Sequence, residues 1–339
     1  MRGRGAKGKL LRTTLLFTIL FIAVEINIFI IADAEYISYK NNQEYITVVD
    51  KSGGADYTTI QDAINNAPED STIYVKIGTY NEIININKKI ILIGENKDKT
   101  IINPISEENK YAIRVRALQV TIKSLSITNS GPGLYTTGIK ISASQTEIED
   151  CNIYDTPVGI AVFTSNNIIN NCNFWGCKDE GIALIGSQYS KCDNNKITNC
   201  IFHDNCDGIE LQYSSNNIIS NCKFYDNTHA GIDAIASSND GNTISNCKIY
   251  NNEVHGIYLS SSSDNQIIDC TISNNNDGNI IMNEASHNNE IKNSDSNTDH
   301  EEDNIRERLV NVNFLRLFQK RFLEVRSILN IPLGRLKSY

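Results

Sequence analysis

The stretch Ile197-Thr-Asn-Cys-Ile-Phe202 recurs 22 residues later as Ile219-Ser-Asn-Cys-Lys-Phe224, and this repetition decides the fold. In most repeats the residue two after the cysteine is Ile or Phe, so both side chains lie on one face of a strand. An Asn or Asp before each cysteine tolerates the left-handed backbone of a sharp bend. Each phrase therefore predicts a strand, a bend and a second strand. Its isoleucines stand at positions 122, 148, 169, 197, 219, 244, 267 and 291, and its cysteines are Cys151, Cys172, Cys200, Cys222, Cys247 and Cys270.

A second phrase, Gly-Ile followed by an apolar residue, supplies a third strand in each repeat. Short strands that recur every 21 to 28 residues can bury their apolar faces only by stacking coil upon coil. The sequence therefore predicts an all-β fold, a single-stranded right-handed parallel β-helix, over residues 35–300. The glycines of this phrase are Gly138, Gly159, Gly181, Gly208, Gly231 and Gly256, with a slipped version at Gly278-Asn-Ile280.

The N-terminal segment differs from the repeats. Residues 1–34 carry five basic and two acidic side chains, with an apolar stretch from Leu15 to Ala32. This pattern predicts export, through either a cleaved signal peptide or an uncleaved signal anchor. Removing the segment would change the formal charge from −9 to −12, and so acidic a chain is not expected to bind nucleic acid. We expect a secreted or cell-surface protein.

Two helices are predicted outside the strands. Ile60, Ala63, Ile64 and Ala67 have the spacing of a short helix that ends at Pro68 and caps the solenoid. Residues 301–339 predict a C-terminal amphipathic helix that forms a second cap. The alternative is a basic tail that docks on a membrane or a partner. Membrane contact is therefore expected only through the two ends of the chain.

Two parts of the sequence resemble known families. Ile46-Thr-Val-Val-Asp-Lys-Ser-Gly-Gly-Ala-Asp-Tyr-Thr-Thr-Ile-Gln-Asp-Ala-Ile64 and Ile73-Tyr-Val-Lys-Ile-Gly-Thr-Tyr-Asn-Glu82 are similar to the N-terminal part of pectin methylesterases. The later coils resemble the repeats of carbohydrate-binding proteins and sugar hydrolases, a group that includes NosD-like copper-maturation proteins. The resemblance implies the pectin lyase-like superfamily and a polysaccharide partner. It implies no esterase activity, because the paired Gln motifs and the Asp-Phe-Ile-Phe-Gly segment of those esterases are missing from the sequence.

Aromatic residues recur three positions after successive cysteines and are expected to face outward. At a strand spacing of about 4.8 Å, five of them span roughly 20 Å, the reach of several sugar rings. Aromatic faces suit sugar rings, so substrate binding is one interpretation. Stacking that only stabilises the sheet is the other. The residues are Tyr154, Trp175, His203, Tyr225 and Tyr250.

Charged residues gather in and after the turn that precedes the Gly-Ile strand. The candidate catalytic residues are Asp207, Glu210, His229, Asp233 and His255, on three neighbouring coils. They could supply paired carboxylates for glycoside hydrolysis, or a histidine base beside calcium for lyase or epimerase chemistry. Solvated turn residues are the alternative interpretation. The candidate calcium ligands are Asp179, Glu180 and Asp207.

The cysteines are interpreted in two groups. The six repeat cysteines are expected to face inward as small apolar side chains, not as metal ligands. Cys177 and Cys206 lie in turns one coil apart, and we expect a disulfide between them in an exported protein. Cys192 is left unpaired in this scheme.

Two functions stay open at this point. The first is an exported β-helix that binds a polysaccharide or cell-envelope glycan and, as an enzyme, processes it as a hydrolase, lyase or epimerase, with calcium as the candidate cofactor. The second is a structural or adhesive surface protein without enzymatic activity, because a fold alone does not define an activity. A copper-maturation role ranks last, because the chain has 2 methionines and its repeat cysteines are expected inside.

Overall fold

The computed structural model describes residues 45–104, 110–129, 131, 133, 136–235 and 238–294, together with the backbone of residues 298–300. The predicted export segment at residues 1–34 and the predicted C-terminal helix at residues 301–339 lie outside the described residues. In the part of the chain that is described, no helix is both long enough and apolar enough to cross a membrane.

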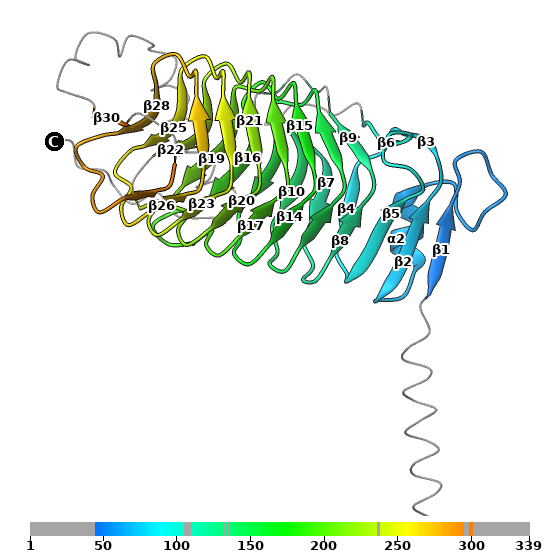
Figure 1. The fold of residues 1–339 in the computed structure, drawn as a ribbon. Coiled ribbons are helices and arrows are strands. Elements are labelled where there is room, and N and C mark those ends of the chain that lie inside the picture. Colours follow the sequence, from blue (N-terminus) through cyan, green and yellow to red (C-terminus); the bar gives the residue numbers. More distant parts are fainter. Residues whose placement is uncertain are drawn as a thin grey trace, which may run out of the picture.

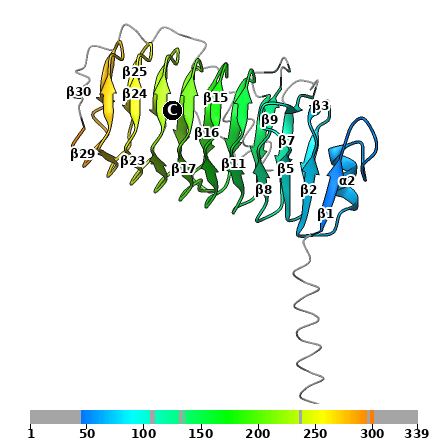
Figure 2. The same ribbon diagram turned by 45° about the vertical axis from the view of Figure 1, so that its right-hand side comes forward.

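The chain winds into a parallel β-helix, as predicted. Its coils stack into an elongated cylinder whose walls are three parallel sheets, with β1 (Ile46–Val49) at one end and β30 (Thr298–His300) at the other (Figure 1, Figure 2). Each complete coil contributes one strand to each sheet, and each strand pairs with its counterparts in the coils before and after it, except that the end strands pair on one side only.

The three sheets are named here by their number of strands. The 11-stranded sheet consists of β1, β2 (Ser71–Val75), β5 (Ile90–Gly94), β8 (Thr121–Lys123), β11 (Glu147–Glu149), β14 (Ile168–Asn170), β17 (Lys196–Thr198), β20 (Ile218–Ser220), β23 (Thr243–Ser245), β26 (Gln266–Ile268) and β29 (Glu290–Lys292). The 9-stranded sheet consists of β3 (Gly78–Tyr80), β6 (Thr100–Ile102), β9 (Ser126–Thr128), β12 (Asn152–Tyr154), β15 (Asn173–Trp175), β18 (Ile201–His203), β21 (Lys223–Tyr225), β24 (Lys248–Tyr250) and β27 (Thr271–Ser273). The 10-stranded sheet consists of β4 (Ile84–Ile86), β7 (Tyr111–Val115), β10 (Thr137–Ile141), β13 (Val158–Val162), β16 (Glu180–Ile185), β19 (Asp207–Gln212), β22 (Ala230–Ala234), β25 (His255–Leu259), β28 (Gly278–Met282) and β30.

The bend between the first two strands of a coil has the predicted geometry. The residue before each repeat cysteine has a positive φ, between 51° and 57°, which is the left-handed region that Asn and Asp tolerate. The chain turns there from the 11-stranded sheet into the 9-stranded sheet. These residues are Asp150, Asn171, Asn199, Asn221, Asn246 and Asp269.

Like residues stack in columns inside the cylinder. The six repeat cysteines are at most 2% exposed, as predicted, and their thiols lie against backbone carbonyls, for example Cys200 Sγ at 3.2 Å from the oxygen of Thr198. Phe174, Phe202 and Phe224 stack with ring centroids 4.7 Å apart. Columns of isoleucine fill the remaining interior. Burial of these apolar side chains is the main stabilising term of the fold.

Two ladders of buried asparagines, which the sequence analysis did not predict, join successive coils. Asn217 shows the pattern: its Oδ1 accepts hydrogen bonds from the backbone N–H and the Nδ2 of Asn195, and its own Nδ2 donates to Asn242. The ladders satisfy backbone donors that the turns would otherwise leave unpaired in the interior. One ladder comprises Asn167, Asn195, Asn217, Asn242, Asn265 and Asn289, and the other Asn205, Asn227, Asn252 and Asn275.

The predicted helix is present as α2 (Ile60–Asn66). Thr59 caps its first turn, and the carboxylate of Glu82 accepts hydrogen bonds from the backbone N–H groups of Ile60 and Gln61 at 2.8 Å each. A carboxylate at this end satisfies donors that have no partner within the helix. Ile60 and Ile64 are buried against the first coils.

The predicted disulfide between Cys177 and Cys206 is not formed, because both residues are free thiols. The backbone N–H of Cys206 donates to the carbonyl of Cys177, so the two residues occupy corresponding positions in neighbouring coils. The Sγ atom of Cys177 lies 4.0 Å from the carbonyl oxygen of Trp175. Cys192 is also a free thiol, and it is buried with its Sγ 3.3 Å from the carbonyl oxygen of Val162.

Candidate functional site

The candidate site lies on the outer face of the 10-stranded sheet, on β19 and β22. A Cβ atom on Gly208 would lie 2.5 Å from the carbonyl oxygen of Gly231 and 2.6 Å from Phe224, so only glycine lets the coils stack this closely here. Beyond this glycine, Ile209 and Leu211 are buried in the core. The intervening Glu210 therefore faces outward. Its register partner on β22 is Asp233, which faces outward in the same way.

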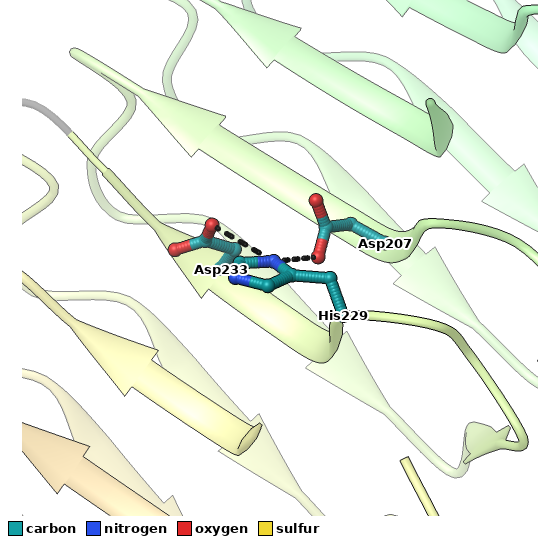
Figure 3. Close-up of side chains that lie close together, drawn as sticks. All are labelled: Asp207, His229 and Asp233. Carbon is teal, nitrogen blue, oxygen red and sulfur yellow. Dashed lines mark hydrogen bonds and ion pairs between the residues drawn. The ribbon is translucent and has the colours of Figure 1, made fainter. Parts of the chain in front are cut away.

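Asp207 and His229 form the closest pair of the site (Figure 3). His229 Nδ1 lies 2.8 Å from Asp207 Oδ1, and the same oxygen accepts the backbone N–H of Ala230 at 2.9 Å. The Asp207 carboxylate is thus held from two directions. Its hydrogen bond raises the pKa of His229 by favouring the imidazolium, although partial burial of the ring acts in the opposite direction.

Asp233 completes the cluster from the next strand (Figure 3). Its Oδ2 lies 3.7 Å from His229 Nδ1, and its side chain is 3% exposed. The Oδ1 atom is buried and has no hydrogen-bond partner among the described residues. Burial, and then the negative charges of Asp207 and Glu180, raise the pKa of Asp233 well above its ordinary value. The site therefore combines a histidine made more basic with a carboxyl group made less acidic.

His255 lies beside this cluster, one coil further on. Its ring is 5.9 Å from that of His229 and stacks on Tyr258 at 5.1 Å. Burial and the nearby His229 lower the pKa of His255 to about 4, so this imidazole is neutral at pH 7. The two histidines consequently have opposite shifts in pKa.

The structure brings together three of the five candidate catalytic residues: potential ligand atoms of Asp207, His229 and Asp233 lie within 4.8 Å of one another. Glu210 adjoins Asp233, and His255 adjoins His229. Among the described residues, the candidate calcium ligands Asp179 and Glu180 do not join this group. Calcium prefers six to eight oxygen ligands. A donor set of two carboxylates and an imidazole therefore fits proton transfer better than calcium.

The predicted aromatic column is present on the 9-stranded sheet. Consecutive rings of Tyr154, Trp175, His203, Tyr225 and Tyr250 are parallel to within 9°, with centroids 4.7 to 6.1 Å apart. Each inner ring therefore covers the faces of its neighbours and presents its edge to solvent. This geometry favours the interpretation that the column stabilises the sheet. Substrate binding by these five residues stays a prediction.

A row of register partners extends from the cluster along the 10-stranded sheet; the sequence analysis named its acidic members Glu210 and Asp233 but missed Arg114 and Lys140. Lys140 and Arg114 occupy one end, two alanines follow, and the acidic residues and a tyrosine occupy the other. All but Arg114 stand two residues after the glycine of a Gly-Ile phrase, and this spacing could have revealed them. In order along the cylinder the row is Arg114, Lys140, Ala161, Ala183, Glu210, Asp233 and Tyr258.

The family model described as right handed beta helix region matches residues 76–240 and 137–297. The chain belongs to this family. Among solved structures similar to this β-helix, pectate lyase Pel9A is 15% identical, with a TM-score of 0.51 over 75% of this chain and 78% of that one. The enzymatically active domain of Bacteriophage CBA120 tailspike protein 2 is also 15% identical, with a TM-score of 0.50 over 74% of this chain and 44% of that one. At such identities the shared property is the fold.

The curated relatives of this β-helix are pectinesterases from Arabidopsis thaliana. Pectinesterase/pectinesterase inhibitor 18 is 32% identical in an alignment of 129 residues that covers 31% of this chain and 22% of that protein. Probable pectinesterase 56 is 26% identical in an alignment of 167 residues that covers 44% of this chain and 58% of that protein. The chain thus covers less than two thirds of these relatives. They confirm the predicted resemblance to pectin methylesterases and the pectin lyase-like fold.

Proposed function

We propose that this protein is exported, binds a polysaccharide or cell-envelope glycan and processes it by acid–base catalysis at Asp207, His229 and Asp233. The observation that carries the proposal is the 2.8 Å contact between His229 and Asp207 beside the buried Asp233. Two ionisable groups whose environments shift their pKa values are typical of catalytic acids and bases. Pectinesterases as relatives support a polysaccharide as the substrate class.

The three residues have distinct roles in this proposal. With the Nδ1 proton of His229 donated to Asp207, the Nε2 atom is free to accept a proton from the sugar. His229 is therefore the general base and Asp207 its positioning residue. Asp233, whose raised pKa favours the protonated carboxyl group, is the general acid. Glu210, its register partner, supplies the second carboxylate of a pair.

The test is an activity assay of the full chain on a panel of neutral and uronic-acid polysaccharides, with calcium and with a chelator. New reducing ends would identify hydrolysis, unsaturated ends elimination, and a changed sugar configuration epimerisation. The variant His229→Ala should lose activity by about 10²–10⁴-fold, the usual contribution of a general base. His287→Ala, which removes an exposed histidine, should be as active as the parent. Equal activity of His229→Ala and the parent would reject the assignment.

The alternative is a structural or adhesive surface protein, and the parallel stacking of the aromatic column favours it. Rings whose faces are covered stabilise the sheet without a ligand. This function predicts no turnover and no glycan binding anywhere on the panel. Replacing Trp175 and Tyr225 by alanine would then lower the thermal stability and change no binding property.

A further inference from the structure

The outer face of the 11-stranded sheet, which runs along the whole cylinder, carries a row of exposed isoleucines (Figure 2). Ile46, Ile91, Ile168 and Ile218 occupy the same register position on β1, β5, β14 and β20. They are 38% to 59% exposed and make up half of the exposed large apolar side chains among the described residues. Single exposed apolar residues need no partner, but a row of them in register indicates an interaction surface. We call it the isoleucine row.

The isoleucine row is self-complementary about its middle strand. β14 is the sixth of the eleven strands, and its Ile168 stands between Glu147 on β11 and Lys196 on β17. Neither of these charged residues has an ion-pair partner in the part of the chain that the structure describes. A two-fold axis along β14 would place each Glu147 opposite Lys196 of a second copy. Sheets that pack face to face lie about 10 Å apart, a gap that these two side chains span together.

The same axis brings β-branched residues together on both sides of the charges. Thr121 would meet Ile218 of the second copy, and Ile91 would meet Thr243. No charged residue of the row would face a like charge, and the same holds for the outward row two residues further along each strand. Like charges in contact are the usual obstacle to packing a surface against itself.

The face is also hollowed where the second copy would project. A groove of about 370 Å³ is lined by Ile91, Thr121 and Glu147 together with residues of the adjoining turns. In the two-fold arrangement Ile218 and the aliphatic part of Lys196 of the second copy lie over this groove, and both side chains are exposed. The arrangement therefore fills a depression of one copy with projecting side chains of the other.

We propose that the protein forms an antiparallel two-fold dimer through the outer face of the 11-stranded sheet, with Ile168 at the axis and Glu147 paired with Lys196 of the second copy. A second copy fits because both charges at the centre of the face find their counterions on that same face. From β5 to β23 the row crosses six strand spacings, or roughly 29 Å. A standard interface of about 800 Å² per partner has a similar width. The dimer leaves the cluster of Asp207, His229 and Asp233 on the 10-stranded sheet uncovered.

Sedimentation velocity of the full chain over a range of concentrations tests the proposal. The parent should reach the mass of two 37.9 kDa chains. Glu147→Lys and Lys196→Glu each place like charges opposite one another at two symmetric points. Each should raise the dissociation constant by about 100-fold, the effect of like-charge contacts across an interface. An equimolar mixture of the two variants should associate as tightly as the parent, because every opposite pair is restored in the heterodimer.

The matched control is Lys248→Glu, which reverses an exposed lysine on the 9-stranded sheet and should dimerise like the parent. Thermal melting shows whether each variant is folded. The proposal is overturned if the parent is a monomer at every concentration, if Lys196→Glu dimerises as tightly as Lys248→Glu, or if the mixture of the two variants stays monomeric. Association through another part of the chain would survive both charge reversals, so that outcome also overturns it.

Discussion

The Asp207 carboxylate is fixed by Ala230 and raises the pKa of His229, so its charge should set the pH at which His229 becomes a base. His229 must be deprotonated to accept a proton, and a raised pKa places the acidic limb of the pH–rate profile at a higher pH. Asp207→Asn removes the charge and keeps the shape. We expect the acidic limb to move to lower pH and the maximal rate to fall by roughly 10-fold, because the base is weaker.

The matched control for this prediction is Asp204→Asn. Asp204 also pairs with a histidine, His203, at 2.6 Å, but it lies outside the cluster. Its replacement should leave the pH–rate profile unchanged. An Asp207→Asn profile with its acidic limb at the parental pH would contradict the role of Asp207.

Asp233 should make the folded state less stable as the pH rises. Its pKa in the folded state is raised, so the native protein holds this proton more tightly than the unfolded chain does. The resulting stability is fully present below the unfolded pKa, near 4, and is lost as the pH rises through the folded pKa. Asp233→Asn cannot ionise. Its melting temperature should therefore exceed that of the parent by an amount that grows as the pH rises above about 4, by ~2–4 °C for each ~1 kcal/mol.

Melting curves across this pH range test the prediction, with Asp264→Asn, at an exposed turn, as the control. A difference between Asp233→Asn and the parent that does not vary with pH would contradict it. The same variant should lose activity. If Asp233→Asn is more stable but less active than the parent, the ionisable Asp233 side chain costs stability and serves activity.

At the residue scale, the sequence predicted which charged residues share neighbouring coils but not how they pair. The backbone N–H of His229 donates to the carbonyl of Cys206, the residue before Asp207, so His229 stands just before β22 and its ring can reach back to Asp207. That offset depends on where each turn ends, which the residue pattern does not specify. The cations at Arg114 and Lys140 were missed because the aromatic and acidic motifs begin only in later coils.

At the scale of elements, the free energy of unfolding lost on replacing an asparagine of the ladder that contains Asn217 should depend on how deeply that asparagine is buried. In Asn217→Ala the backbone N–H of Asn195 loses its acceptor in a fully buried site. We expect a loss of about 2–4 kcal/mol, because an unsatisfied buried donor adds its desolvation cost to the lost bonds. Asn289→Ala, at the last described step of the ladder, should cost less, since Asn289 is only half-buried.

Chemical denaturation of the two variants measures the difference in free energy of unfolding. Equal losses for Asn217→Ala and Asn289→Ala would contradict a ladder whose inner members matter most. The strands, the bends and α2 could be predicted because they depend on local spacing. The ladders could not, because the partner of each asparagine is supplied by the next coil and not by its own.

On the scale of the whole molecule, a solenoid is stabilised coil by coil, so protection from hydrogen exchange should vary along its axis. The strands β1 and β29 pair on one side only, whereas β17 and β20 pair on both. Since each coil contacts only its neighbours, the end coils should open more readily than the middle. Amide exchange followed by mass spectrometry should show fast exchange at β1 and β29. Uniform protection from β1 to β29 would indicate a single cooperative unit instead.

The number of coils determines the length of the outward row of the 10-stranded sheet. Because adjacent coils share the same strands, bends and glycines, a further coil inserted between β10 and β16 would leave the contacts within both ends of the row as they are. It would move Lys140 and Asp233 apart by one strand spacing, about 4.8 Å. The length of the row can therefore change only in steps of one strand spacing, which is set by the hydrogen bonds between neighbouring strands.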